Sequence, residues 1–506
     1  MKIENSRRRG PRVTRRRHIV LSTLTLLTAT LAPAAHAAPT PASSPELPVA
    51  WKPCAENPSA QCGTIRVPLD WKRTTGEQID VRVARVPARD RAHRVGSLLF
   101  NPGGPGGQGA TMLAYGQADL LFPGPLRDRF DIVSLDPRGT GGSRALECGP
   151  VLDPGQVVFP GSTLGYEEMR RSSRARGERC LARYGALVRN VDTVSVARDM
   201  DVFRAALGEE RLNYLGVSYG SHLGATYARL FPHRVRAMVL DGPMDHSSGP
   251  TRFLREEAAA MEEEFGRFAA WCAEDAACAL HGEDVGAVYD RVVARADRTP
   301  IPAPGGGEGA AVDGDRIRMT LPVQLLRVRL IEDATGTNAW VNLAAELAAA
   351  DRRNDASGLL RGGGYVGAQD SPYTAVSCLD FPPQFTGYAD AAARLDLARR
   401  VAPRTGAAVE GWVMSASCAD WPVEATNPWQ PAPVRGAPPI LIAANTHDPA
   451  TPLPGARRLH QRIAGSRLLV TEVNGHVSYY NSGCARERET AYLISARMPA
   501  RLSCPG

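Results

Sequence analysis

The chain has 506 residues, of which 43% are hydrophobic and 22% are charged, and its formal net charge is +7. These proportions are typical of a globular protein and exclude a disordered chain, a fibrous repeat and a polytopic membrane protein. A basic surplus can indicate an anionic partner, so its location matters. The sequence contains no recognisable internal repeat and no nucleic-acid-binding module, and we expect no nucleic-acid partner.

The positive surplus lies in residues 1–37. This segment has one acidic residue, Glu4, and the following basic residues: Lys2, Arg7, Arg8, Arg9, Arg12, Arg15, Arg16 and Arg17. An apolar run over 19–33 and the triplet Ala35-His36-Ala37 follow, which is the order of a signal peptide and its cleavage site. Arg16 and Arg17 also fit a twin-arginine signal, so the Sec and twin-arginine export routes both stay open. We therefore predict a secreted protein.

The segment after this signal is rich in Pro and Ser, and we predict a flexible lead-in over 38–50. The apolar run of the signal is short for a membrane span, so no stable span is expected once the signal is removed. The oligomeric state is not indicated by the sequence.

Ten cysteines agree with export, because an even number in an exported chain favours disulfides. The chain has no Cys-x-x-Cys pair, which argues against a zinc ribbon and a thioredoxin-like site. The sequence leaves the connectivity open. The simplest hypothesis pairs sequence neighbours: Cys54–Cys62, Cys148–Cys180, Cys272–Cys278, Cys378–Cys418 and Cys484–Cys504.

Short apolar runs recur along the chain, as buried strands do. They lie at Val81–Val86, Ser97–Phe100, Asp131–Leu135, Leu212–Leu215, Val235–Leu240, Pro439–Ala444 and Arg467–Val470. Helical patterns separate several of them, for example Val194–Leu207 and Ser221–Phe231. This alternation predicts an α/β fold with a mainly parallel sheet that is covered by helices on both faces.

Between Pro243 and Ala437 the pattern becomes mostly helical. Helices are expected at Phe253–Cys272, Trp340–Ala350 and Ala391–Val401. In the first of these, apolar residues recur at three- and four-residue steps, and the glutamates form a separate face: Glu256, Glu257, Glu262, Glu263 and Glu264. We predict a helical cap insertion over 246–437 that divides a core into residues 51–245 and 438–506.

The strongest chemical motif is Gly216-Val217-Ser218-Tyr219-Gly220. It follows a predicted strand and precedes a predicted helix, which is the context of a nucleophile elbow. Glycines at both ends of such a turn remove Cβ atoms that would collide with neighbouring backbone. The motif predicts that the Ser218 hydroxyl is a catalytic nucleophile, although Gly-x-Ser-x-Gly also occurs in ordinary turns.

A serine nucleophile needs a base, and the base needs an orienting acid. In α/β-hydrolases the chain order is Ser, acid, His. Asp448 follows one predicted strand and His476 follows the next, so both belong to the sheet edge that carries Ser218. His447 and His222 are competing histidines, but His447 precedes the acid and His222 lies in the helix after the elbow.

The glycine-rich segment 101–107 follows an early predicted strand. Its backbone N–H groups, at Gly103 and Gly104, are candidates for an oxyanion hole together with the N–H of Tyr219. The segment lacks Gly-Lys-Ser/Thr, which excludes a Walker loop, and no dinucleotide-binding fingerprint is evident.

The segments 101–107 and 136–143, the elbow, Asp448 and His476 together resemble the prolyl-aminopeptidase-related α/β-hydrolases, and most closely the secreted tripeptidyl aminopeptidase group. The segments around Cys378, Cys418 and Cys484–Cys504 resemble that group's cap and C-terminal region. Asn101 stands where prolyl aminopeptidases usually have His, which favours the tripeptidyl branch. The resemblance implies an α/β-hydrolase fold and the release of short peptides from a free N-terminus, without a metal or an organic cofactor.

An aminopeptidase of this kind must recognise the α-ammonium group of a peptide, and carboxylates in the cap would supply the counter-charge. The candidates are Glu256, Glu257, Asp380 and Asp420. We prefer Asp380, because a Cys378–Cys418 bond would bring Asp380 and Asp420 together, whereas both glutamates fit a solvated helix face. The alternatives are a secreted esterase or lipase on the same scaffold and a binding protein with a degenerate hydrolase fold.

Overall fold

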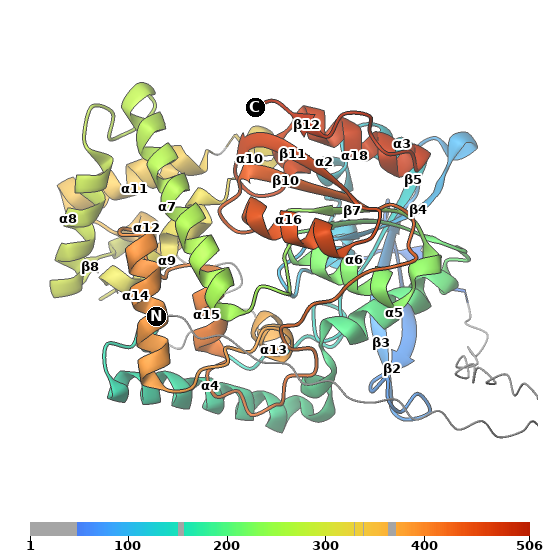
Figure 1. The fold of residues 1–506 in the computed structure, drawn as a ribbon, viewed down its shortest axis with the longest axis horizontal. Coiled ribbons are helices and arrows are strands. Elements are labelled where there is room, and N and C mark those ends of the chain that lie inside the picture. The colour runs from blue at the N-terminus through green and yellow to red at the C-terminus, as the bar shows by residue number, and fades with distance from the viewer. Residues whose placement is uncertain (1–47, 150–155, 328, 337, 363–370) are drawn as a thin grey trace, which may run out of the picture. The chain divides into compact units, whose positions relative to one another are not determined.

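The computed structural model describes residues 48–149, 156–327, 329–336, 338–362 and 371–506 (Figure 1). The predicted signal peptide and residues 38–47 of the predicted lead-in lie outside these ranges. Within the described ranges, no helix combines the length and the apolar character needed to cross a membrane.

The part of the chain that carries Ser218 contains a ten-stranded sheet. Its spatial order is β1 (Lys52–Pro53), β2 (Gln61–Pro68), β3 (Gln78–Val86), β5 (Phe130–Leu135), β4 (Gly96–Asn101), β6 (Leu212–Val217), β7 (Val235–Asp241), β10 (Leu441–His447), β11 (Arg467–Asn474) and β12 (Ser503–Cys504). The strands from β5 to β12 are parallel, whereas β1, β2 and β3 pair in antiparallel fashion at one end. The predicted mainly parallel sheet is therefore confirmed.

Both faces of the sheet are buried, because successive side chains of a strand point to opposite faces. Leu99 and Tyr214 belong to one apolar cluster, whereas Leu98 and Leu215 belong to another. This explains why the central strands are continuously apolar in sequence instead of alternating with polar residues.

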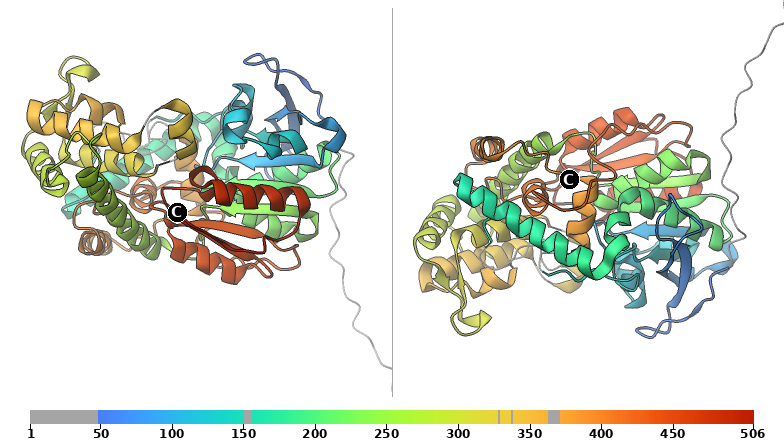
Figure 2. Two further views of the ribbon diagram at one scale, coloured as in Figure 1. Left: turned by 90° about the horizontal axis from the view of Figure 1, so that it is seen from above. Right: turned by 90° about the horizontal axis from the view of Figure 1, so that it is seen from below.

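Helices flank the sheet on each side (Figure 2). They are α1 (Gly109–Ala114), α2 (Ala118–Leu121), α3 (Pro125–Arg129), α5 (Thr193–Ala206), α6 (Tyr219–Leu230), α16 (Leu453–Arg462), α17 (Ser478–Asn481) and α18 (Gly483–Ser495). Helices α5 and α6 pack against each other, and α6 contacts β6 and β7. Buried residues of α1 and α18 belong to the cluster on the opposite face.

The segment between β7 and β10 is mostly helical. It contains α7 (Pro250–Glu274), α8 (Val285–Arg298), β8 (Ile301–Pro302), β9 (Ala311–Val312), α9 (Gly314–Leu325), α10 (Arg329–Thr335), α11 (Ala339–Arg353), α12 (Ser357–Gly362), α13 (Ser371–Asp380), α14 (Tyr388–Val401) and α15 (Glu410–Ser417). We call this segment the cap.

One long helix that precedes β6 also packs against the cap. Helix α4 (Thr163–Tyr184) contacts α14 and α15 (Figure 1). This helix has no clear amphipathic pattern in the sequence, because its buried face includes Ser173, Arg176 and Gly177 beside a few apolar residues. A Cβ atom at Gly177 would lie 2.2 Å from Cδ of Pro422, so this glycine permits the close packing of α4.

The cysteines of the structure pair as sequence neighbours. The five bonds are Cys54–Cys62, Cys148–Cys180, Cys272–Cys278, Cys378–Cys418 and Cys484–Cys504. Two of them bridge separate elements of the fold, since Cys378 lies on α13 while Cys418 follows α15, and Cys484 lies on α18 while Cys504 lies on β12. Disulfides agree with an oxidising environment.

A fully buried ion pair fixes the turn that follows β5. The Arg138 guanidinium donates to both carboxylate oxygens of Asp199, at 2.7 and 2.6 Å, and neither side chain is exposed. Further N–H groups of Arg138 donate to the carbonyl oxygens of Pro68, Leu69 and Asn190. The motif 136–143 thus has a structural role, because Arg138 joins it to β2 and α5.

Arg138→Met should lower the free energy of unfolding by about 3–5 kcal/mol, because it leaves the Asp199 carboxylate buried without its counter-charge. The measurement is denaturant unfolding followed by circular dichroism. Arg144→Met is the control, since Arg144 pairs with Glu77 at 3.5 Å with 50% and 61% of the two side chains exposed. Such surface pairs contribute about 0–1 kcal/mol. Equal losses in the two variants would contradict the structural role of Arg138.

Candidate active site

Ser218 lies at a sharp turn between β6 and α6. Its backbone has φ 58° and ψ −129°, a region that side-chain-bearing residues seldom adopt. The Ser218 N–H donates to the carbonyl oxygen of Asp241 at 2.8 Å, and the Ser218 carbonyl accepts from the N–H of Ser221 at 2.9 Å. Such strain costs on the order of 1–3 kcal/mol and is common where a nucleophile must project from a sheet.

Glycines make this turn possible. A Cβ atom at Gly216 would lie 2.3 Å from the carbonyl oxygen of Gly220. A Cβ atom at Gly103 would lie 2.8 Å from Cβ of Ser218, so the glycine-rich loop after β4 approaches the elbow closely. The structure therefore brings the two predicted motifs side by side.

Asp448 and His476 meet at the C-terminal ends of β10 and β11. Nδ1 of His476 lies 2.9 Å from each carboxylate oxygen of Asp448. The Asp448 carboxylate also accepts the N–H groups of Ala450 and Thr451, both at 2.9 Å, and it is 1% exposed. These contacts orient the imidazole ring so that its Nε2 is the nitrogen left for proton transfer.

The electrostatic surroundings favour the protonated form of His476. Burial lowers the pKa of His476 and the adjacent Asp448 carboxylate raises it, and the net pKa lies above the usual value. The carboxylates of Asp241 and Glu410 act in the same direction. The ring can therefore hold a proton that it takes from a nucleophile.

The two competing histidines have other partners. His447 contacts Glu263 at 2.8 Å and Arg267 at 2.8 Å on α7. His222 is buried and stacks on His246 with ring centroids 4.3 Å apart, and burial holds its pKa well below the usual value. In the described part of the chain, neither histidine contacts Asp448. This agrees with the sequence argument, which disfavoured both because of their positions along the chain.

The proposed oxyanion donors differ in whether their N–H groups already have an acceptor within the protein. The Gly103 N–H donates to Oδ1 of Asn101 at 3.0 Å, so it serves to hold the loop. Among the described residues, no acceptor bonds the backbone N–H of Gly104 or of Tyr219. Gly104 and Tyr219 are thus better placed to donate than Gly103, and Asn101 has a structural role that its residue type did not reveal.

The four carboxylates predicted to meet a substrate ammonium group all have protein partners. Glu256 pairs with Arg458 at 2.6 Å, and Asp420 pairs with Arg174 at 3.0 Å. Glu257 accepts the N–H groups of Glu410 and Gly411 at 2.9 and 2.7 Å, and so caps helix α15. It is fully buried, which corrects the prediction that it lies on a solvated face.

Asp380, the preferred candidate, is also fully buried. Its carboxylate accepts the N–H and the hydroxyl of Thr193 and the side-chain amide of Asn427. Asp420 lies with Arg170 and Arg174, so the Cys378–Cys418 bond does not bring the two aspartates into one site. The disulfide was inferred correctly, but the ends of the two helices point to different partners.

Two other carboxylates of the cap act on the Asp448–His476 pair. Glu264 on α7 is 1% exposed, and neither of its oxygens has a hydrogen-bond partner among the described residues. Burial raises the pKa of Glu264 to about 8; Arg267 and Arg327 oppose this shift, whereas Asp448 adds to it. Glu410 at the start of α15 is 8% exposed and accepts a hydrogen bond from Tyr373 at 2.8 Å.

The buried position of Glu264 has a signal in the sequence. Glu257 and Glu264 are three residues after Leu254 and Met261, so they extend the apolar stripe of α7. Glutamates that share a buried stripe are candidates for a site, whereas Glu263 on the other side is half exposed. The position of Glu410 had no local signal.

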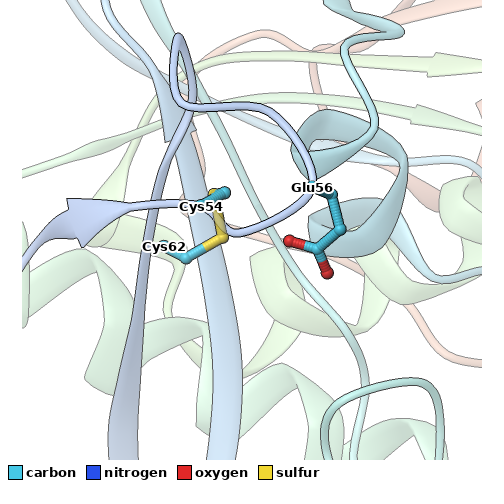
Figure 3. Close-up of side chains that lie close together, drawn as sticks. All are labelled: Cys54, Glu56 and Cys62. Atoms are coloured by element: carbon cyan, nitrogen blue, oxygen red, sulfur yellow. A yellow bond between two sulfur atoms is a disulfide. The ribbon is translucent and has the colours of Figure 1, made fainter.

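Only one cluster of possible metal ligands occurs among the described residues, formed by Cys54, Glu56 and Cys62 (Figure 3). The two sulfur atoms are joined in a disulfide, and Glu56 pairs with Arg82 at 2.7 Å. Because a metal would require thiolates, this cluster is a disulfide-closed turn and not a ligand set.

The chain matches the family model of the alpha/beta hydrolase fold over residues 96–303 and the model of TAP-like proteins over residues 404–504. It is 33% identical over 492 residues to the serine protease Hip1 of Mycobacterium tuberculosis, covering 89% of this chain and 90% of that protein. It is 32% identical over 482 residues to the tripeptidyl aminopeptidase of Streptomyces lividans, covering 89% and 85%. It is also 31% identical over 468 residues to carboxylesterase B of Mycobacterium tuberculosis, covering 87% and 85%.

The fold and these matches define an enzyme of the serine hydrolase class. The chain belongs to the α/β-hydrolase family and to its TAP-like group. The resemblance and the fold class predicted from the sequence are therefore confirmed.

The raised pKa of Glu264 predicts a pH-dependent effect of Glu264→Gln on stability. The folded protein keeps a proton on Glu264 up to a pH of about 8, whereas the unfolded chain releases it near the usual value of 4.5. Wild-type stability therefore decreases relative to the variant as the pH rises between these values. In thermal unfolding, the melting temperature of the variant minus that of the wild type should rise progressively from pH 5 to pH 8. The exposed Glu274→Gln, at the end of the same helix, should give no such trend, and a difference independent of pH would contradict the burial effect.

Proposed function

We propose that this protein is a secreted serine exopeptidase that releases short peptides, tripeptides in particular, from free N-termini. The Ser218 hydroxyl attacks the scissile carbonyl, His476 accepts its proton, and Asp448 holds the imidazole. The N–H groups of Tyr219 and Gly104 stabilise the tetrahedral oxyanion. His476 then protonates the leaving amine, and water hydrolyses the acyl-enzyme.

The observation that carries the proposal is the combination of the Asp448–His476 pair and the Ser218 elbow with the buried side chain of Glu264. Burial keeps a proton on this group in the absence of a cation, because its pKa is raised to about 8, and a cation would stabilise its carboxylate form. The α-ammonium group of a peptide is such a cation. The Asp448 carboxylate contributes to the raised pKa of Glu264, and the Glu410 carboxylate contributes to the raised pKa of His476, so both cap residues interact electrostatically with the Asp448–His476 pair. The relative named tripeptidyl aminopeptidase supports the length of the released product.

Secretion is supported by the signal-like residues 1–37 and by the disulfides. The core over 51–245 and 438–506 would then form the catalytic scaffold, and the cap over 246–437 would bind the N-terminal residues of the peptide. The contacts of α4 with α14 and α15 extend the cap with a segment from the first part of the core.

The second candidate function is an esterase, which the relative named carboxylesterase B favours. The same triad cleaves esters, so the two functions differ in what the cap recognises. An esterase for neutral acyl groups has no use for buried carboxylates beside the triad. The distinction therefore depends on the N-terminus of the substrate.

Ser218→Ala should reduce kcat by on the order of 10⁶-fold, because no other group attacks the carbonyl. The measurement is mass spectrometry of the products from a decapeptide with a free N-terminus, where the wild type releases the first three residues. The N-acetylated decapeptide should stay intact. A fluorophosphonate should label the wild type and spare the variant, which also excludes a degenerate binding protein. Cleavage by the variant would contradict the mechanism, and equal cleavage of both peptides would contradict the exopeptidase.

Glu264→Gln should raise KM for free-amine peptides by roughly 10- to 100-fold, since a charge-assisted contact contributes about 1.5–3 kcal/mol. The hydrolysis of a short acyl ester, which has no ammonium group, should stay within about twofold of wild type because the triad is unchanged. The matched control is Glu274→Gln on the same helix, which should alter neither rate. Parallel losses on peptide and ester would show that Glu264 supports the fold and does not bind the substrate.

A further inference from the structure

Asp380 is joined to the elbow by a short chain of hydroxyl groups. The Thr193 hydroxyl donates to the Asp380 carboxylate, and the Thr193 oxygen lies 2.5 Å from the hydroxyl of Tyr219. Asp380 ends cap helix α13, Thr193 begins core helix α5, and Tyr219 begins helix α6 directly after Ser218. All three residues are buried, with Asp380 and Thr193 fully so.

In this series of hydrogen-bonded hydroxyl groups, each hydroxyl proton can point in one direction only. A threonine hydroxyl has a single proton to donate, so when Thr193 donates to the Asp380 carboxylate, its oxygen accepts from Tyr219. The second contact of Asp380 with Thr193 is through the backbone N–H at 3.0 Å, one of the donors that a helix N-terminus leaves unsatisfied. Asp380 therefore fixes both the hydroxyl and the start of α5.

Further contacts fix Asp380 itself. Its second carboxylate oxygen accepts from Asn427 at 2.9 Å, and its carbonyl oxygen lies 2.7 Å from Nε2 of His246. The next residue, Phe381, packs on the Tyr219 ring with centroids 6.4 Å apart. The Tyr219 side chain is thus anchored by its hydroxyl, through Thr193 of α5, and by its ring, through Phe381 at the end of α13.

We propose that Asp380, through Thr193 and the Tyr219 hydroxyl, is a positioning residue that aligns the Tyr219 N–H in the oxyanion hole. The inference rests on the proposed function only in that Ser218 is the nucleophile and Tyr219 an oxyanion donor. Ser218 has a strained backbone, so the next peptide group keeps its direction only if neighbouring contacts hold it. The cap thereby influences the transition state without touching the substrate at this point.

The test compares Tyr219→Phe, Thr193→Val and Asp380→Asn with Tyr227→Phe. The first two variants remove one hydroxyl and keep the shape of the side chain. Asp380→Asn replaces one acceptor oxygen by an amide NH₂ group, which opposes the donors of Thr193 at one oxygen position or the donor of Asn427 at the other. Tyr227 is the matched control, because it is buried on the same helix α6 and donates to a carboxylate, that of Asp201, at 3.0 Å. Steady-state kinetics and the inhibition constant of a peptide boronic acid, which forms a tetrahedral adduct, are measured for each.

Tyr219→Phe and Thr193→Val should each lower kcat by roughly 10- to 100-fold at a KM within about twofold of wild type. The boronic acid should bind more weakly by a similar factor, because its adduct places an oxygen in the same hole. The double variant Tyr219→Phe/Asp380→Asn should lose no more than the stronger single variant, since the residues act in one chain. Tyr227→Phe should leave both constants unchanged.

Unchanged kcat in Tyr219→Phe and Thr193→Val, an equal effect in Tyr227→Phe, or additive losses in the double variant would overturn the positioning role. All variants must still react with a fluorophosphonate, which shows that a lowered kcat does not result from the loss of a reactive Ser218. If the wild type cleaves a short acyl ester but no peptide, the exopeptidase proposal fails, and the same comparison on the ester still decides the role of Asp380. A misfolded Asp380→Asn leaves the two hydroxyl variants as the deciding pair.

Discussion

The backbone strain at Ser218 is the constraint on which the site depends, and Asp241 at the end of β7 is the residue that holds it. Its carbonyl oxygen accepts the Ser218 N–H, and its carboxylate accepts the N–H groups of Ser478 and Tyr479 at 2.8 and 2.7 Å. One buried aspartate thus fixes the nucleophile and the loop that carries His476. Burial raises the pKa of Asp241 to about 6, and the two backbone donors keep it from rising further.

The cap completes this arrangement and is not a separate lid. The His476 N–H donates to the carbonyl oxygen of Leu326 at 2.7 Å, so the cap segment after α9 holds the backbone of the histidine. A Cβ atom at Gly475 would lie 2.5 Å from the carbonyl oxygen of Arg327, which requires glycine there. Together with Glu257, which caps α15 and so places Glu410, these contacts make the geometry of the core dependent on the cap.

The structural features that sequence predicted well are those encoded by spacing along the chain. The turn at Ser218, the central strands and the neighbour pairing of cysteines depend on residues that are close in sequence, and the Asp448–His476 contact depends on their positions after neighbouring strands. The roles of the candidate carboxylates depend instead on distant partners that sequence spacing does not reveal: Asp380 binds Thr193, which is 187 positions away. Helix α4 was missed because Ser173, Arg176 and Gly177 occupy its buried face.

The difference between features set by spacing along the chain and features set by distant partners also applies to specificity. A family of α/β-hydrolases can share the triad while the cap decides which acyl group reaches it. In this chain burial keeps Glu264 protonated up to a pH of about 8, and no hydrogen bond in the described part of the chain holds its carboxylate form. A neutral acyl chain therefore meets a neutral acid and is not penalised, whereas an ammonium group would stabilise the carboxylate form. Under the proposed function, selectivity for a free N-terminus follows from a buried acid that a cation converts to its charged form.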